Sequence, residues 1–271
     1  TFAPDGTLAA HLQLISPQVS LVVLVDDTGA GGEDRVYPIG NLVVIRNPAN
    51  FGIAKALNIG IACAAQHGCE WILTLDDDTQ IRPDYLDIVF SFIESGKVPQ
   101  VGIVALSRPA DGAPPPPSVD GYRIRRNIIT SGSVSPLELF RALDGFSEDL
   151  FIDLVDFDFC CRARKLGRAL VVLDEVGMEH RVGNSESRRW LGRRTTVYHH
   201  APFRLYYQAR NALVFARRHF RFDPLLCLVL LADVLRLPAK AVCFERDKLA
   251  RLKFIVAGLR DALRGRLGRL A

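Results

Sequence analysis

Three consecutive aspartates, Asp76 to Asp78, end the apolar run Trp71–Leu75. If that run is a buried strand, it delivers clustered carboxylates to the carboxyl end of a sheet, where open α/β sheets bind their ligands. Carboxylate oxygens bind divalent cations, and a cation offsets the repulsion between crowded like charges. The pattern therefore predicts a divalent-metal site. The alternative is an acidic turn before a helix that begins near Pro83 and Asp84, although one capping carboxylate suffices for that role.

Two further carboxylate groups stand at expected element ends. Asp26 follows the apolar run 19–25 and can accept hydrogen bonds from a nucleobase N–H or a ribose hydroxyl. Asp153, Asp156 and Asp158 lie around the start of an expected helix, where the helix dipole favours an ionised carboxylate. A carboxylate beside a metal-bound substrate is suited to act as general base on a hydroxyl nucleophile, and Asp156 is the candidate. The alternative for each of the three is a helix N-cap.

His180 is a candidate metal ligand, because it follows the expected strand 169–173. An imidazole nitrogen could complete the coordination of a cation held by the aspartates. A single histidine can equally be structural, and both interpretations stay open.

The elements that must position these residues alternate between strands and helices. Runs that are apolar on both faces, as buried parallel strands are, cover 19–25, 42–45, 71–75 and 101–106. Helical spacing predicts one helix over 53–66 and another over 84–94. This order predicts a doubly wound, mostly parallel α/β sheet whose strands end at one edge.

Later segments are less regular. A stiff loop with four successive prolines is expected over 110–118. The further elements expected before the C-terminal region are a sheet segment near 122–130, helices over 136–143 and 156–167, and a strand over 169–173. From Phe203 the pattern is purely helical, with one helix over 203–220 and two over 225–269 that separate near Pro238.

The charge is distributed unevenly along the chain. The net charge is +4, with −10 over residues 1–180 and +14 over residues 181–271. Basic residues flank the apolar stripes of the C-terminal helices, which predicts contact with an anionic membrane surface or, alternatively, a solvated outer face. We expect no nucleic-acid partner, because the sequence has no recognisable binding motif and no interleaved aromatic residues.

Several functional classes are disfavoured by what the sequence lacks. It shows no signal peptide and no apolar run of the roughly 18–20 residues that a spanning helix needs. The run 225–237 is too short and contains Asp233. The six cysteines form no CxxC pair, which favours buried thiols in a reducing compartment over a zinc site. We predict a cytoplasmic protein that can lie on the cytoplasmic face of the inner membrane.

Several motifs, all in chain order, carry a resemblance to a known family. They are Asn50–Gly60, Leu75–Thr79, Ser131–Ser133 and Asp144–Asp153. With them the chain resembles the family 2 glycosyltransferases of the GT-A fold. The runs that resemble the bacterial rhamnosyltransferase branch in particular are Val155–Arg164, His180–Asn184 and Tyr206–Asn211. The resemblance extends over about residues 1–220.

The resemblance implies an activity and a domain organisation. The activity is an inverting transfer of a sugar, in particular L-rhamnose from dTDP-L-rhamnose, to a hydroxyl of a cell-surface glycan or lipid-linked acceptor. The alternative donors are UDP-galactofuranose or a UDP-hexose. The organisation is a GT-A nucleotide-sugar-binding and catalytic domain over residues 1–202, followed by basic amphipathic helices over residues 203–271.

The resemblance also implies roles for individual residues. Asp76 and Asp78, with His180, would bind Mg²⁺ or Mn²⁺, and Asp156 would be the catalytic base. The residues that would contact the donor nucleotide are Asp26, Asn50, Gly52, Lys55, Asp76, Asp77, Ser131 and Gly132.

Two positions depart from the family pattern. Val155 stands where many members have a glutamate directly before the base, although the rhamnosyl branch commonly shows valine. The family's first strand has no counterpart, because Thr1–Gly6 match the residues that come after that strand. We therefore expect that an N-terminal segment is missing from the sequence.

Two other classes of protein remain as alternatives. A haloacid-dehalogenase-like phosphatase also ends a strand in two spaced aspartates, but it needs Thr or Val two residues after the second, where this chain has Gln80. A non-catalytic nucleotide-binding module would bind the donor, and this binding would survive the change Asp156→Asn with no turnover in either protein.

Overall fold

The structure is a computed structural model that describes residues 1–2, 4, 6–30, 36–108, 118–180, 185–190, 193–198, 201–244 and 247–270. The chain divides into two compact units, the first formed by Thr1–Glu148 with Val155–Arg181 and the second by Asp149–Leu154 with Val182–Ala271. The division into domains 1–202 and 203–271 stays a prediction. Among the described residues, no helix is long and apolar enough to cross a membrane.

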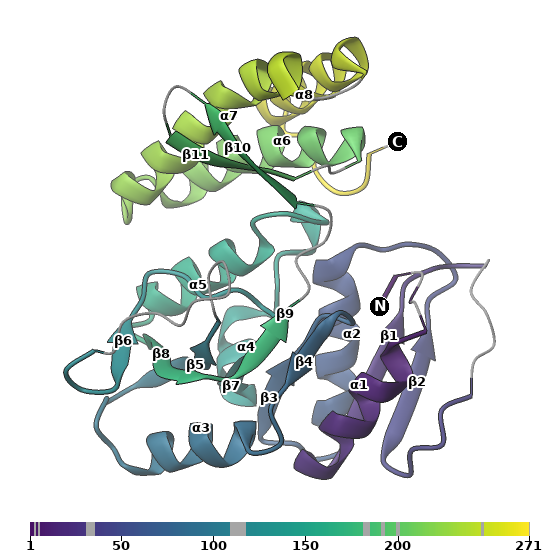
Figure 1. The fold of residues 1–271 in the computed structure, drawn as a ribbon, viewed down its shortest axis with the longest axis vertical. Coiled ribbons are helices and arrows are strands. Elements are labelled where there is room, and N and C mark those ends of the chain that lie inside the picture. Colours follow the sequence, from purple (N-terminus) through teal and green to yellow (C-terminus); the bar gives the residue numbers. More distant parts are fainter. Residues whose placement is uncertain are drawn as a thin grey trace. The chain divides into compact units, whose positions relative to one another are not determined.

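The first unit alternates helices and strands (Figure 1). In chain order its elements are α1 (Leu8–Ile15), a 3₁₀ turn (Ser16–Gln18), β1 (Val22–Asp26), β2 (Leu42–Arg46), α2 (Ile53–Gln66), β3 (Trp71–Thr74), β4 (Thr79–Ile81), α3 (Tyr85–Glu94), β5 (Val101–Ser107), β6 (Tyr122–Ile124), β7 (Ser133–Pro136), α4 (Leu137–Leu143), α5 (Val155–Lys165), β8 (Ala169–Val176) and β9 (Met178–His180). A second 3₁₀ turn (Glu148–Leu150) leads from the first unit into the second.

The strands of this unit form three sheets. The central sheet has the order β3-β7-β5-β8-β6, while β1 pairs with β2 and β4 pairs with β9. Strands β1 and β2 are parallel, as are β5 and β8, but β7 is antiparallel to both β3 and β5. The α/β class is confirmed, and the central sheet is mixed rather than mostly parallel. One reason is the serine-rich segment Ser133–Pro136, which the apolar pattern did not mark as a strand, and the other is β6, which pairs antiparallel with β8.

Apolar side chains on one face of α1 and of α3 cover the sheets; the sequence predicted α3 but not α1. Leu8 and Leu12 of α1 pack on the β1–β2 pair, and α3 packs on the central sheet. The buried core under α3 consists of Ile81, Tyr85, Val89, Val104, Leu106, Val134, Val171, Leu173 and Met178. Phe140 of α4 stacks on Phe159 of α5, with 4.9 Å between the ring centroids. These contacts fix the strand ends that carry the aspartates.

Several predicted bounds agree with the structure and a few do not. Helix α2 begins and ends where the sequence predicts, and α3 and α4 begin within one residue of the expected positions. Strand β1 begins only at Val22, because the 3₁₀ turn Ser16–Gln18 precedes it. The predicted proline-rich loop lies outside the described residues except for Ser118.

The second unit is a hairpin followed by three helices among its described residues (Figure 1). Its elements are β10 (Ser185–Trp190), β11 (Arg193–Tyr198), α6 (Pro202–His219), α7 (Pro224–Phe244) and α8 (Lys248–Leu263). Strands β10 and β11 pair antiparallel, where the sequence predicted no regular structure. A Cβ on Gly258 of α8 would lie 2.3 Å from the carbonyl oxygen of Tyr206, so glycine is needed for the close packing of α8 on α6.

The predicted helix break at Pro238 is wrong, because α7 continues through that residue to Phe244. A proline inside a helix removes one backbone hydrogen bond without necessarily ending the helix. Helix α8 follows Asp247, its N-cap residue, which has a left-handed φ of 56°.

Candidate functional site

The aspartate turn between β3 and β4 is held by buried hydroxyl groups. The backbone N–H of Asp76 donates to Ser131 Oγ (3.0 Å), and Ser131 Oγ donates to Thr79 Oγ1 (2.7 Å). Ser131 is only 1% exposed and Thr79 is fully buried. Both contacts are short and enclosed, so they fix where the turn projects its carboxylates. The hydroxyl of Ser131 therefore orients the turn, and its contact with a donor nucleotide stays a prediction.

Asp77 joins the turn to the end of β1. The hydroxyl of Thr1 donates to the Asp77 carboxylate, and the carbonyl of Thr1 accepts from the backbone N–H of Asp27 (2.9 Å). His11 Nδ1 lies 2.8 Å from the Asp77 carbonyl oxygen. The structure thus brings the aspartate turn next to Asp26 and Asp27. The contact of Asp77 with a ribose stays a prediction.

The possible metal ligands at the aspartate turn are the carboxylates of Asp76 and Asp78 and the imidazole of His180. Strand β9 places the backbone of His180 opposite Thr79, the residue after Asp78; the imidazole lies outside the described side chains. Among the side chains that are described, no group of three carboxylate, imidazole or thiol ligands gathers anywhere. Mg²⁺ is commonly held by one or two carboxylates, waters and the phosphates of a substrate. Asp76 and Asp78 therefore fit a cation that a phosphate ligand helps to hold.

Asp27 is a structural residue that the sequence analysis missed. Its carboxylate is 5% exposed and accepts from Asn47 Nδ2 (2.8 Å) and from the backbone N–H groups of Phe51 (3.0 Å) and Gly52 (2.9 Å). Asp26, in contrast, accepts from the backbone N–H of Thr28 (3.0 Å). The sequence does hold a signal for the structural role of Asp27, because two aspartates stand in a row at the end of β1. One carboxylate there is enough to bind a ligand, which leaves the other for a structural role.

Three predicted donor residues lie together at the start of α2. Asn50 Oδ1 accepts from the backbone N–H of Gly52 (3.0 Å), and Gly52 has a φ of 87° that favours glycine. Lys55 Nζ lies 4.8 Å from the ring centroid of Phe51 and 4.0 Å from a carboxylate oxygen of Glu148. The Lys55 side chain is 43% exposed, so its ammonium is within reach of an anionic ligand.

Gly132 has no room for a side chain. It has a φ of 81°, and a Cβ there would lie 2.1 Å from Met178 Cε. Its N–H donates to the Thr74 carbonyl (2.8 Å), and its carbonyl accepts from the hydroxyl of Tyr85. Burial raises the pKa of Tyr85 to about 12. Gly132 therefore locks the segment that carries Ser131 against β3.

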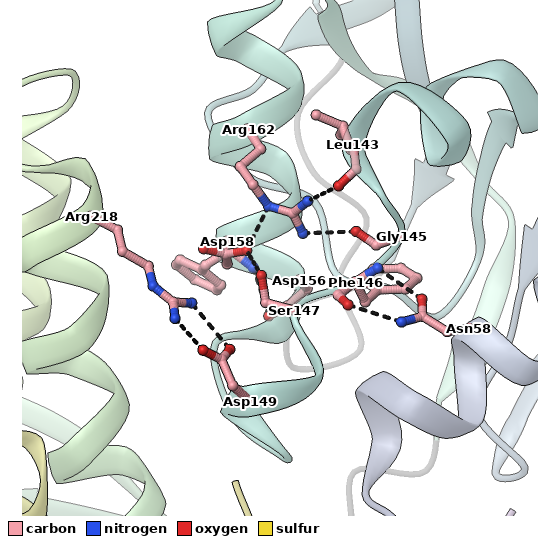
Figure 2. A network of polar contacts seen from close by, with 11 residues as sticks. Asn58, Leu143, Gly145, Phe146, Ser147, Asp149, Asp156, Asp158, Arg162 and Arg218 are labelled. Atoms are coloured by element: carbon pink, nitrogen blue, oxygen red, sulfur yellow. Dashed lines mark hydrogen bonds and ion pairs between the residues drawn. The ribbon is translucent and has the colours of Figure 1, made fainter. Parts of the chain in front are cut away.

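A polar network holds the segment before α5 (Figure 2). Asn58 of α2 accepts from the N–H of Phe146 (2.8 Å) and donates to its carbonyl (2.9 Å). Asp158 is 1% exposed and accepts from Ser147 Oγ (2.6 Å) and Arg162 Nε (2.7 Å). Because Asp158 is buried in these contacts, it is a structural anchor of α5.

Asp156 is the second residue of α5 and is partly exposed. Its Oδ1 accepts from the backbone N–H of Phe157 (2.9 Å). One turn later, Cys160 Sγ lies 3.3 Å from both the nitrogen and the oxygen of Ile128. Burial raises the pKa of the Cys160 thiol to about 12, and the negative charge of Asp156 contributes to this shift. The turn of α5 that follows Asp156 is thus in contact with Ile128, three residues before Ser131.

Comparison with known proteins adds a family and a relative. Residues 17–137 match the family described as glycosyl transferase family 2. The dTDP-rhamnosyl transferase RfbF of Shigella flexneri is 26% identical over 284 residues, which cover 99% of this chain and 95% of that protein. The likeness therefore extends over both units.

Solved structures share the fold. The mannosyltransferase PcManGT from Pyrobaculum calidifontis, in complex with GDP-Man and Mn²⁺, has a TM-score of 0.58 at 15% identity and matches 97% of this chain and 85% of that one. TarS of S. aureus in complex with UDP-GlcNAc has a TM-score of 0.56 at 16% identity, over 98% of this chain and 79% of that one. These likenesses confirm the GT-A fold.

Proposed function

Residues 17–137 match glycosyltransferase family 2, and from that match we propose that the chain is a member of this family that transfers L-rhamnose from dTDP-L-rhamnose to an acceptor hydroxyl with inversion. The observation that carries this proposal is the aspartate turn, which projects Asp76 and Asp78 from the end of β3 and is fixed by Ser131. The choice of donor is supported by the likeness to a dTDP-rhamnosyl transferase over 99% of the chain.

Each group of residues has one part in the reaction. Asp76 and Asp78 would hold a divalent cation, Mg²⁺ or Mn²⁺, which when bound would neutralise charge on the departing diphosphate. Asp26, Asn50, Gly52 and Lys55 line the side of the nucleotide. Asp156 accepts the proton of the acceptor hydroxyl as its oxygen bonds to the anomeric carbon and the bond from that carbon to the diphosphate oxygen breaks. Inversion follows when the base acts on the ring face opposite the leaving group.

The role of Asp156 is tested with Asp156→Asn, which keeps the shape of the side chain and removes the base. We expect the rate of transfer or of donor hydrolysis to fall by about 10²–10⁴-fold, the usual contribution of a general base. Calorimetry with dTDP and Mn²⁺ should show unchanged binding. The matched control is Asp84→Asn, at an exposed aspartate that pairs with Arg82. Equal turnover in the Asp156 variant and the control would remove Asp156 as the base.

The metal assignment is tested with Asp78→Ala. The variant should lose turnover and should no longer respond to added Mn²⁺ or Mg²⁺, because a carboxylate ligand is gone. A screen of dTDP, UDP and GDP by thermal shift, with and without metal, identifies the nucleotide. Metal-dependent activity that survives Asp78→Ala would contradict the assignment, and a preference for UDP would contradict the rhamnose donor.

We further propose that the second unit rests on an anionic membrane, where a lipid-linked acceptor would be found. Apolar side chains on α7 and α8 are exposed, among them Leu235 (80%), Leu249 (77%) and Val256 (62%). The basic residues Lys253 and Arg260 lie on the same side of α8 as Leu249 and Val256, at helical spacing. A helix of this kind inserts its apolar side chains while its basic ones meet the lipid phosphates.

Sedimentation with vesicles of phosphatidylglycerol tests this contact. Binding should weaken as the salt concentration rises, because screening reduces the electrostatic part. Leu235→Glu should reduce binding at every salt concentration. Equal binding to anionic and neutral vesicles would contradict the role of the basic residues, and no binding at low salt would favour a solvated outer face.

A further inference from the structure

The segment Asp149–Leu154 of the second unit has an unfavourable backbone conformation. Three of its non-glycine residues have left-handed φ values, 66° at Phe151, 65° at Asp153 and 63° at Leu154. Bulky L-residues rarely adopt this region, because the Cβ atom crowds the backbone. Such a conformation persists only where surrounding contacts impose it.

Asn211 of α6 supplies those contacts. Its Nδ2 donates to the carbonyl oxygens of Leu150 (3.0 Å), Ile152 (2.7 Å) and Asp153 (2.9 Å). Asn211 is fully buried, so water does not replace these hydrogen bonds. One amide group therefore holds three carbonyls of the left-handed segment.

Arg210 orients this amide and extends the same set of contacts. Its Nε donates to Asn211 Oδ1 (2.8 Å), which turns Nδ2 toward the carbonyls, and its Nη2 donates to the Leu150 carbonyl (2.8 Å). The guanidinium lies 4.9 Å from the ring centroid of Tyr207, and Phe151 stacks on the same ring at 5.1 Å. Arg210 is also fully buried.

We propose that Asn211, oriented by Arg210, is a positioning residue for the catalytic base; this rests on the proposed function of Asp156. The left-handed segment ends at Leu154, which is bonded to Val155, the first residue of α5. The dihedral angles at 151–154 therefore set how the chain enters the first turn of the helix, which contains Asp156. Asp158, at the end of this first turn, has its own anchor, the ion pair with Arg162, so loss of the Asn211 contacts should disturb the residues that precede Asp158.

The experiment compares Asn211→Ala with Asn211→Gln and with the matched control Gln208→Ala on the same helix. With dTDP-rhamnose as donor, Asn211→Ala should lower kcat by about 10–100-fold while KM for the donor stays within about twofold, since a misplaced base slows chemistry without weakening ground-state binding. Asn211→Gln keeps the donor group and should recover part of kcat. Gln208→Ala should match the wild type.

A second variant keeps the proposal falsifiable if Asn211→Ala folds poorly. Glycine adopts positive φ without steric penalty, so Leu154→Gly in the Asn211→Ala background should restore part of kcat. A purely structural role of Asn211 predicts no such recovery, because Leu154→Gly also removes a side chain that packs against α6. Failure of both this double variant and Asn211→Gln to exceed Asn211→Ala in kcat would overturn the proposal.

Hydrogen exchange separates this proposal from the proposed function. In Asn211→Ala the amides of residues 151–157 should exchange faster, while those of α6 and of the Asp158–Arg162 turn keep their protection. If the wild type shows no turnover with dTDP-rhamnose, the proposed function fails, and hydrogen exchange alone tests whether Asn211 positions the start of α5. Faster exchange confined to residues 151–157 supports that positioning role. Unchanged exchange overturns it. A kcat for Asn211→Ala within about twofold of the wild type would also overturn it.

Discussion

Two buried polar groups of opposite character each hold one backbone segment in place. In the first unit the carboxylate of Asp27 accepts hydrogen bonds from the segment 47–52. In the second unit Arg210 and Asn211 donate to the carbonyls of the segment 149–153. One group collects N–H donors and the other collects carbonyl oxygens.

The difference follows from the backbone groups that each segment leaves unsatisfied. Segment 47–52 leads into the first turn of α2, where backbone N–H groups have no partner within the helix and the dipole favours a negative charge. The left-handed residues of segment 149–154 leave its carbonyls to be satisfied by side chains of α6. In both places backbone dipoles surround a buried charge. Removing either charged group should therefore take a hydrogen bond from several backbone groups at once.

Replacing Arg210 should have the largest effect on stability. Arg210→Met keeps much of the side-chain volume but removes every donor, so the carbonyls of Asp149, Leu150 and Gly268 each lose a hydrogen bond from the guanidinium. We expect the free energy of unfolding to fall by about 4 kcal/mol, because three carbonyls and the Asn211 amide oxygen lose hydrogen bonds from a buried charged group. Urea denaturation followed by circular dichroism measures this change.

Arg210→Lys is the matched control, since it keeps the charge and loses the planar fork. Lysine cannot reach all of these carbonyls at once, so the loss should be about half as large, about 2 kcal/mol. A loss below about 1 kcal/mol for Arg210→Met would show that water or rearranged side chains satisfy these carbonyls, and that the second unit does not depend on this group.

Replacing Asp27 should have the next largest effect. Asp27→Asn is isosteric, but it puts an NH₂ donor where a carboxylate oxygen accepted, facing the N–H groups of Phe51 or Gly52. We expect a loss of about 2–3 kcal/mol, the usual value for a hydrogen-bonded charge that is removed from a buried site. Urea unfolding of Asp26→Asn, with less than about 1 kcal/mol expected, is the control, and equal losses in the two variants would contradict the distinction between neighbouring aspartates.

The sequence predicts best those parts that depend on near neighbours. Helix α2, the strand before the aspartates and the start of α5 follow from apolar spacing within one element. The aspartate turn was predicted because three carboxylates in a row have few structural explanations. Among the predicted site residues, Asp76 and Ser131 are brought into direct contact.

The parts that the sequence did not predict depend on residues far apart in the chain. Strand β7 pairs through backbone groups, so its serines leave no apolar pattern. Asn211 bonds the carbonyl of Ile152, 59 positions earlier, and nothing local distinguishes it from a solvent-facing asparagine. Helix α7 passes Pro238 because the packing of its other turns outweighs one lost hydrogen bond.

The hydroxyl of Tyr85 is a neutral group that holds two backbone groups, in contrast to the charged Asp27 and Arg210. Its removal should cost the least stability of the three. Tyr85 donates to the Gly132 carbonyl and accepts from the N–H of Leu106 (3.0 Å), so Tyr85→Phe should cost about 1–2 kcal/mol at neutral pH. Burial raises the pKa of Tyr85 from 10.0 to about 12. The stability from the neutral hydroxyl is therefore complete below pH 10 and is lost as the pH rises toward 12, because the unfolded chain gives up this proton first. Urea unfolding at pH 8 and pH 11 should show the gap between the wild type and Tyr85→Phe narrowing, and an equal gap at both values would mean that the hydroxyl is not held in its neutral form.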